Sequence, residues 1–252
     1  MRDDLGATVR LGPVTSSGPG RVVSLVPSLT EAVAETVPGV LAGITDYCTH
    51  PVLELPRIGG SKYPRVTDVL AVRPDLVLAN AEENRPEDVA QLRAAGVPVW
   101  VTAAPATVPE ALDSLARLFR EVWAAEPGWL AEARELWQEV PEPAATVLVP
   151  VWRRPWVVLG RHTFAGDVLR RLGFTNVYAG HPERYPRPPL AELQGCGAEL
   201  VVLPDEPYEF TATDGPDAFP GRRCVLLSGR LLTWHGPSLV RARTELAAAF
   251  SS

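Results

Sequence analysis

The chain has 252 residues, of which 46% are hydrophobic and 21% charged, a balance typical of a globular protein with one large domain or two lobes. Its formal net charge of -6 argues against nucleic acid or an anionic membrane as partner, because both attract basic surfaces. The sequence contains no run of about 18 apolar residues, so it predicts no membrane-spanning helix.

The sequence of the first part of the chain predicts alternating strands and helices. Residues 1–20 are expected to form a hairpin-like arm or a loose segment. The mostly β-branched run at 22–26, closed by Pro27, predicts a strand buried on both faces, and Ser28 or Thr30 is expected to cap the next helix. Apolar runs then alternate with amphipathic segments, which indicates a small parallel α/β sheet. The strands expected here are 22–26, 40–44, 76–79 and 97–102, and the helices are 30–37, 66–72 and 86–95.

Two helical segments are expected in the middle of the chain. The first has Pro109 in its first turn and carries one apolar stripe. The second starts near residue 127 and stops before Pro141 and Pro143. It is about 13 residues long, or roughly 20 Å at the rise of an α-helix.

A second α/β unit is predicted in the C-terminal part of the chain. Its strands are expected at 146–151, 157–159, 200–203 and 224–227, its helices at 164–172, 190–194 and 239–250, and its two long loops at 152–156 and 180–189. The fold class is therefore α/β. The expected parts are an arm (1–20), an N-terminal lobe (21–104), a helical linker (105–143) and a C-terminal lobe (144–252).

The sequence shows no catalytic or metal-binding motif. It lacks a G-x-S-x-G nucleophile elbow, and Cys48 and His50 stand two residues apart on an expected loop, which does not define a nucleophile and its base. Phosphate-binding glycine loops are also lacking. Cys48, Cys196 and Cys224 are odd in number and far apart, which excludes a disulfide framework. The four histidines are widely separated as well, so we predict no catalytic residue and no metal ligand.

Seven short motifs follow one another along the chain. They are PSLTE (27–31), GITDY (43–47), RIGG (57–60), AVRPDLVLA (71–79), GRHTF (160–164), LPDEPY (203–208) and LTWHGP (232–237). In this order they resemble the cobalamin-type substrate-binding proteins of ABC importers, the helical-backbone class that also includes ferric-siderophore and haem binders. The resemblance extends from residue 21 to the C-terminus. It implies two α/β lobes with short central parallel sheets, a helical linker and a ligand cleft between the lobes.

Aromatic residues in loops are the main candidates for ligand binding. They are Tyr47, Tyr63, Trp152, Trp156, Tyr185, Tyr208 and Trp234. Aromatic faces are large and rigid, so they hold a flat, mostly apolar macrocycle at a small cost in entropy. Tyr47 and Trp234, with the adjacent His235, match cleft positions of the resembling family. For Trp156 and Tyr208 the alternative is an aromatic lid over the local core.

Three polar residues complete the candidate ligand-binding set. Ser28 lies where free helix amides would meet an anionic ligand edge, and simple capping is the alternative. Asn80, like Ser61, occupies a position that resembles a tryptophan position of the cobalamin binders. His235 is expected to hydrogen-bond a ligand side chain or to cap a loop, and the alternative is that its imidazole faces or coordinates the metal of the ligand.

Acidic residues provide a candidate docking surface for a transport partner. Glu82, Glu83 and Glu206 match positions at which the resembling family presents carboxylates to arginines of a membrane permease. Charges of this kind steer the approach of two proteins and fix how they align more than they add to their affinity. The alternative is that they are ordinary solvated side chains.

The resemblance implies that the chain binds a corrinoid, cobalamin-like ligand as a substrate-binding protein of an ABC importer, without catalysis and without a required cofactor. A ferric-siderophore or haem binder is the alternative within the same class. A cytosolic cofactor-handling protein or enzyme that reuses the fold is the alternative from another class. The expected partners are a small metal chelate and an ABC permease, with no nucleic acid, and the protein is expected to be a monomer.

The N-terminal residues bear on cellular location. Residues 1–20 contain Arg2, Asp3 and Asp4 and then mainly small and polar residues, without the apolar core of a signal peptide or a lipid-acceptor cysteine. As it stands, the sequence predicts a cytoplasmic protein. If the true N-terminus is missing, the expected location is extracytoplasmic.

Overall fold

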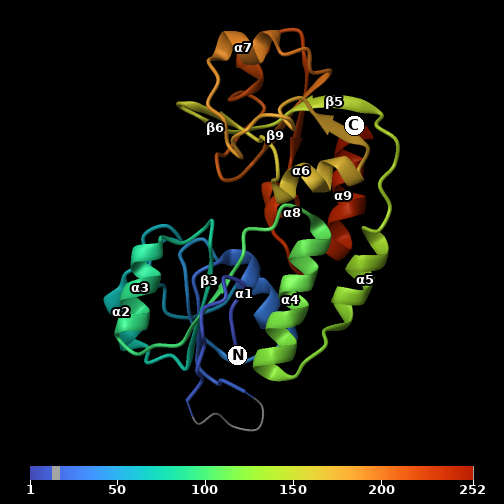
Figure 1. Cartoon of the computed structure of the whole chain (residues 1–252). Helices are drawn as coiled ribbons and strands as arrows, with labels where there is room; N and C mark the ends of the chain where they lie inside the picture. The colour runs from blue at the N-terminus through green and yellow to red at the C-terminus, as the bar shows by residue number, and fades with distance from the viewer. Residues whose placement is uncertain (13–17, 252) are drawn as a thin grey trace. The chain divides into compact units, whose positions relative to one another are not determined.

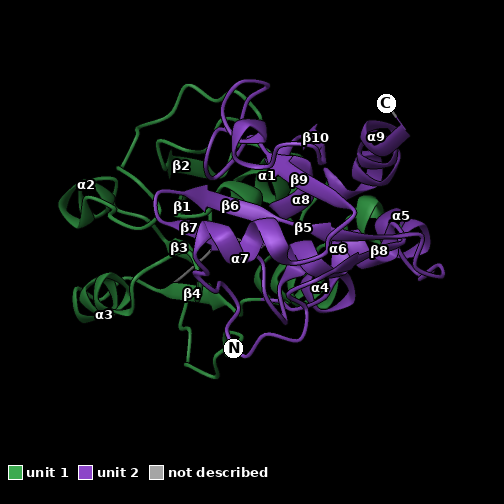
Figure 2. Cartoon of the chain, turned by 90° about the horizontal axis from the view of Figure 1, so that it is seen from above, with its two compact units in different colours: residues 1–104, 112–131, 235–237 green, residues 105–111, 132–234, 238–252 purple. Residues whose placement is uncertain are grey.

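The computed structural model describes residues 1–12 and 18–251 (Figure 1). The chain divides into two compact units, which Figure 2 shows in different colours. Unit 1 comprises residues 1–104, 112–131 and 235–237, and unit 2 comprises residues 105–111, 132–234 and 238–252. Each unit is therefore assembled from several stretches of the chain.

Unit 1 is built on a four-stranded parallel sheet with the strand order β2-β1-β3-β4. The strands are β1 (Val22–Ser24), β2 (Leu41–Ile44), β3 (Leu76–Asn80) and β4 (Val99–Thr102), and the helices are α1 (Pro27–Thr36), α2 (Val66–Ala71) and α3 (Pro86–Ala94). Every residue of β1, β3 and β4 is buried, as expected for parallel strands covered on both faces. Helices α2 and α3 cover one face, and α1 lies on the other (Figure 1).

The start of α1 differs from the prediction. The helix begins at Pro27, and Val26 occupies the capping position without a side-chain hydrogen bond, so neither Ser28 nor Thr30 is the cap. Thr30 lies within the helix, and its hydroxyl donates to the Val26 carbonyl at 3.1 Å. Proline has no N–H to satisfy and its φ is already helical, which makes it a natural first residue.

Unit 2 contains a second four-stranded parallel sheet, with the order β10-β9-β5-β8, and a separate antiparallel hairpin β6-β7. The strands are β5 (Ala145–Leu148), β6 (Pro150–Arg153), β7 (Trp156–Val158), β8 (Phe174–Asn176), β9 (Leu200–Pro204) and β10 (Arg223–Leu227). The helices are α6 (Phe164–Arg171), α7 (Leu190–Gly195), the 3₁₀ turn η1 (Pro216–Ala218), α8 (Gly229–Thr233) and α9 (Leu239–Ser251).

Two local predictions for unit 2 are wrong. The single strand expected at 146–151 is split into β5 and β6, because Pro150 cannot donate a hydrogen bond to a central ladder. The loop expected at 152–156 is largely the β6-β7 hairpin, in which Arg153 pairs with Trp156. Elements of three to five residues, such as β8 and α8, were missed because so few residues show no clear periodicity.

Two helices connect the units along the chain. They are α4 (Val108–Trp123) and α5 (Gly128–Leu136), and the division between the units falls inside both. Helix α5 has 9 residues and is shorter than the segment predicted from the sequence. The predicted α/β fold with two short parallel sheets and a helical linker is confirmed.

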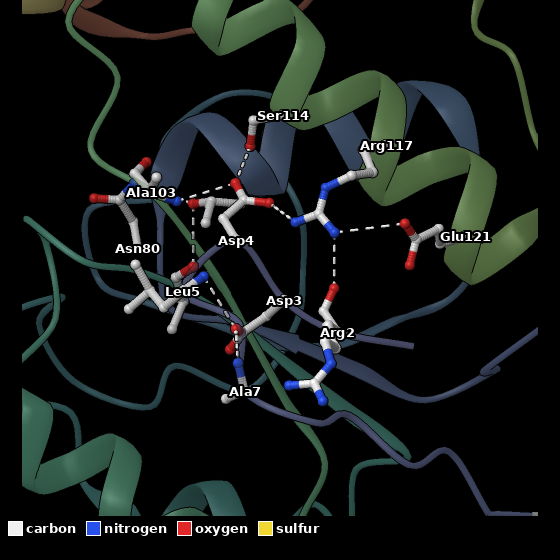
Figure 3. A network of polar contacts seen from close by, with 12 residues as sticks. Arg2, Asp3, Asp4, Leu5, Ala7, Asn80, Ala103, Ser114, Arg117 and Glu121 are labelled. Atoms are coloured by element: carbon white, nitrogen blue, oxygen red, sulfur yellow. Dashed lines mark hydrogen bonds and ion pairs between the residues drawn. The ribbon is translucent and has the colours of Figure 1, made fainter.

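The N-terminal arm is tied to unit 1 over its described residues, whereas residues 13–17 lie outside them. Arg2 and Thr8 form an antiparallel bridge, and the amide of Asp4 donates to the Val101 carbonyl of β4 at 3.1 Å. Figure 3 shows the Asp4 carboxylate bonded to Ser114 and Arg117 of α4 and to the Ala103 amide. The arm therefore covers the β4 edge and fixes the unit 1 part of α4 to the sheet.

Candidate ligand-binding site

Tyr47 presents an exposed ring just past the carboxyl end of β2. Its side chain is 66% exposed, and the ring lies against Gly60, where a Cβ atom would be 3.2 Å from the Tyr47 ring. A hydrogen bond of 2.9 Å from the Asp46 amide to the Gly59 carbonyl fixes the loop beneath the ring. The second glycine of the RIGG motif thus leaves room for the tyrosine.

Tyr63 presents the second exposed ring of unit 1. It is 71% exposed, and the guanidinium of Arg85 lies over it, 4.8 Å from the ring centroid. Arg85 is held by two hydrogen bonds to Asp88, of 2.8 and 2.9 Å. Arg85 therefore holds one face of the Tyr63 ring and fixes the direction in which the other face points.

Asn80 has a structural task at the end of β3. It is 2% exposed, and its side-chain oxygen accepts hydrogen bonds from the Glu82 and Glu83 amides at 2.8 and 3.2 Å. Its side-chain nitrogen donates to Thr102 Oγ1 and the Ala103 carbonyl. Asn80 thus shapes the turn that carries the two glutamates. Ser61 is also buried, so neither of the two positions compared with tryptophan presents an open surface.

Ser28 and His235 lie in the same unit although they are far apart in the sequence. Ser28 is buried in the first turn of α1, and residues 235–237 belong to unit 1. A Cβ atom on Gly236 would lie 3.3 Å from the Ser28 carbonyl oxygen, so this glycine allows the segment to pass close to α1. His235 itself is half-buried.

Three of the predicted aromatic residues of unit 2 form one cluster with two phenylalanines. Trp152 contacts Tyr208 edge-on at 5.6 Å between ring centroids, and Tyr208 lies 4.7 Å from Phe210. Trp156 stacks on Phe210 and meets Phe219 edge-on at 5.4 Å. Phe210 and Phe219 are buried, whereas Trp152 is 43% exposed. The cluster therefore leads from the core of unit 2 to an exposed indole.

A polar brace holds this aromatic cluster in place. Arg153 forms ion pairs with Asp217 and Asp214, and its guanidinium lies 5.6 Å from the centroid of the Trp156 ring. The Tyr208 hydroxyl donates to Asp214 at 2.6 Å. The hydrogen bond from Arg153, aided by that from the Gly215 amide, holds the pKa of Asp217 far below its usual value. Ring positions are therefore fixed before any ligand arrives.

The other two aromatic candidates of unit 2 lie outside this cluster. Tyr185 is 37% exposed on a loop that is pinned by hydrogen bonds from Gly160 to Arg184 and from Val158 to Pro186. Trp234 is 6% exposed and packs under the guanidinium of Arg230, 5.6 Å from the ring centroid. Tyr185 therefore offers a surface to a ligand, whereas Trp234 offers little.

The three candidate docking glutamates lie on loops after β3 and β9. Glu83 is exposed as a residue, yet desolvation of its carboxyl group raises its pKa, and nearby Lys62 opposes this shift. Because Glu83 is exposed, its carboxylate nevertheless remains largely solvated. Glu206 is half-buried and packs on Gly229, where a Cβ atom would clash with it.

The sequence did not single out Phe210, Phe219, Arg153, Asp214 and Asp217 as part of a site. The available signal was weak, since Phe210 stands two residues after Tyr208 and Arg153 stands beside Trp152. Within residues 1–12 and 18–251 no group of three or more His, Cys, Asp or Glu side chains is arranged to hold a metal ion. Searching the same residues finds no helix with both the length and the apolar character needed to cross a membrane.

Two short parallel sheets, joined along the chain by α4 and α5, are the features to compare with known proteins. No family model matches the chain. The vitamin B12-binding protein of Vibrio cholerae serotype O1 is 25% identical over 177 residues, which are 66% of this chain and 64% of that protein. The chain thus matches a little under two thirds of the length of this relative.

Solved structures match almost the whole chain. The periplasmic heme-binding protein BhuT in complex with two hemes is 26% identical and superposes with a TM-score of 0.72, covering 92% of this chain and 97% of that one. The periplasmic vitamin B12 binding protein BtuF of Vibrio cholerae is 18% identical with a TM-score of 0.70, covering 93% and 97%. Over almost its whole length the chain is similar in fold to these periplasmic binding proteins, in line with the resemblance carried by the seven motifs.

The predicted cytoplasmic location is wrong. Three solved structures that match the chain over more than nine tenths of its length are described as periplasmic heme- or vitamin B12-binding proteins. They indicate an extracytoplasmic location. The composition of residues 1–20, on which the prediction depended, was therefore a misleading guide.

Proposed function

We propose that the chain is a substrate-binding protein of an ABC importer that binds a corrinoid ligand and releases it unchanged. The observation that carries the proposal is the presence, in both units, of exposed aromatic rings on braced loops or on the braced β6-β7 hairpin. Tyr47 and Tyr63 are supplied by unit 1, and Trp152 and Tyr185 by unit 2. The similarity to a vitamin B12-binding protein supports the same ligand.

The chemistry of these rings suits a broad, flat ligand. Aromatic faces bury a large apolar area with few rotatable bonds, so they hold a macrocycle at a low cost in entropy. Polar groups at the rim, such as the Tyr47 and Tyr63 hydroxyls and the His235 imidazole, would bind the amide edges of a corrin. The relatives are binding proteins, which supports a role without catalysis and without a cofactor of its own.

Haem is the second candidate ligand. It is favoured by the 26% identity to a structure described as a complex with two hemes, a higher identity than that to the B12-binding structure. A haem is also flat and mostly apolar, but it carries two carboxylates where a corrin carries amides. The visible spectrum of the complex distinguishes the two ligands.

The partners follow from the same proposal. An importer of this class delivers its ligand to a membrane permease, and Glu82, Glu83 and Glu206 are the carboxylates proposed to meet arginines of that permease. The protein is proposed to act as a monomer. Charge reversal of Glu82 and Glu206 should leave ligand binding unchanged and weaken binding to a reconstituted permease.

The test is thermal unfolding against a panel of cobalamins, haem and ferric chelates. A ligand at 100 times its Kd stabilises the folded state by about 2.7 kcal/mol and raises the Tm. The double variant Tyr47→Ala, Trp152→Ala should lose this shift, while Val52→Ala, at an 86% exposed apolar side chain, should keep it. A full shift in the double variant, or no shift with any compound of the panel, would contradict the proposal.

A further inference from the structure

A buried ion pair in unit 2 touches both helices that lead to unit 1. Arg171 donates from Nε to Asp167 Oδ2 at 2.7 Å, and the two side chains are only 8% and 4% exposed. Both residues lie on α6. A pair this deeply buried is costly to desolvate unless further hydrogen bonds satisfy both partners.

Asp167 accepts a hydrogen bond from the first amide of α4. Its Oδ2 accepts a hydrogen bond of 2.9 Å from the amide of Val108, the first residue of that helix. The first amides of a helix have no partner within the helix, and the helix dipole makes this end favourable for an anion. Burial alone would raise the pKa of Asp167, but hydrogen bonds from Arg171, Val108 and Arg170 outweigh it, so the carboxylate is kept charged.

Arg171 donates hydrogen bonds to the carbonyls at the C-terminal end of α5. Its Nη1 donates to the carbonyls of Trp137 and Gln138, the two residues that follow the helix. The last carbonyls of a helix lack partners in the helix, and a cation is favourable there. One ion pair thus complements the unit 2 ends of both helices with the charge that each end prefers.

In unit 1 other contacts hold the same two helices. Asp4 of the arm binds Ser114 and Arg117 of α4, and Trp129 of α5 donates to Thr36 Oγ1 of α1 at 3.1 Å. Helix α4 is therefore bound by a buried carboxylate in each unit, through Asp4 in one and Asp167 in the other.

We propose that Asp167 and Arg171 form a positioning clamp that fixes both linker helices on unit 2 and so restricts the motion of unit 1 relative to unit 2. The contacts of the clamp lie within unit 2, so it acts with or without ligand. Without it, the first amide of α4 and the two carbonyls that follow α5 lose their partners together, and both helices become free to pivot on α6.

Arg170 provides a matched control for this clamp. It also binds Asp167, at 2.6 and 2.9 Å, but it is 52% exposed, and among the described residues we identify no side-chain hydrogen bond from it to α4 or α5. Arg170→Met and Arg171→Met therefore remove the same kind of charge from the same carboxylate. They differ in that only Arg171→Met removes the contacts to the linker.

The test measures the distance distribution between spin labels on the two units in the ligand-free protein. The labels are placed at Gln91 of α3 and Ala191 of α7, both exposed, in a background in which Cys196 and Cys224 are replaced by Ser. Arg171→Met should widen the distribution, and Arg170→Met should leave it as in the unaltered background. Equal widths in the two variants, broad or narrow, would overturn the clamp.

Hydrogen exchange provides the second measurement. In Asp167→Asn the Val108 amide should exchange about tenfold faster, because a charge-assisted hydrogen bond is replaced by a neutral one. Arg170→Met should leave that rate unchanged. If Arg171→Met fails to fold, Arg171→Lys keeps the charge but loses the planar fork, and it should still widen the distribution. Unchanged width and unchanged exchange would overturn the proposal, and neither readout requires a ligand.

Discussion

The two units hold their exposed aromatic rings in different ways. In unit 2, Trp152 stands at the end of a chain of ring contacts that continues through Tyr208 and Phe210 into the core. In unit 1, Tyr47 rests against a glycine and Tyr63 against one arginine, and neither ring contacts a second ring in any interaction that we identify within residues 1–12 and 18–251.

Because of this difference, mutations in the two units should affect folding stability and ligand affinity to different degrees. Because the rings of unit 2 share their packing with the core, a change beneath them should cost stability as well as affinity. Rings that lie on the surface of unit 1 contribute little to folding, so changes there should act mainly on the ligand. Under the proposed function, unit 2 would thus be a preformed platform for the ligand, and unit 1 would supply ligand contacts that can be altered without loss of stability.

The largest expected effect comes from truncating the buried support of the platform. Phe219 is 2% exposed and lies under Trp156, so Phe219→Ala should reduce the free energy of unfolding by about 3 kcal/mol or more. Tyr63→Ala, at a 71% exposed ring of unit 1, should change it by less than about 0.5 kcal/mol. Urea unfolding followed by far-UV circular dichroism measures both. Similar losses in the two variants would remove the distinction between the units.

An intermediate effect concerns pH and the brace of unit 2. The folded pKa of Asp217 is lowered mainly by Arg153, so its contribution to stability is present above the unfolded pKa, near 3.9, and is lost as the pH falls through the folded value. Asp217→Asn should therefore be less stable than the unaltered protein at pH 6, and the difference should shrink below about pH 3.5. Melting temperatures measured from pH 2 to 7 provide the check. A difference that does not vary with pH would contradict the assigned pKa shift.

The comparison also shows what the sequence can and cannot predict. The buried β1 and β3 strands were visible because continuous apolar runs follow from burial on both faces. The Asp217 partner of Arg153 was not visible, since the two stand 64 residues apart and only the tertiary fold brings them together. Asn80 entered the candidate site through its resemblance to a tryptophan position, and its buried role as the acceptor that forms the turn was not visible in the sequence.

The smallest expected effect on folding comes from Gly60 in unit 1. A Cβ atom there would approach the Tyr47 ring to 3.2 Å, so in Gly60→Ala this exposed ring must shift by a few tenths of an ångström. We expect stability to change by less than about 0.5 kcal/mol, because the ring can move into solvent. The Kd for the ligand should rise severalfold, because a misplaced aromatic face loses contact with a rigid macrocycle. Gly180→Ala, where a Cβ atom meets nothing within 4 Å, is the control that should leave both quantities unchanged. If Gly60→Ala binds the ligand as tightly as this control, Tyr47 does not contact the ligand, and unit 1 must bind it through other residues.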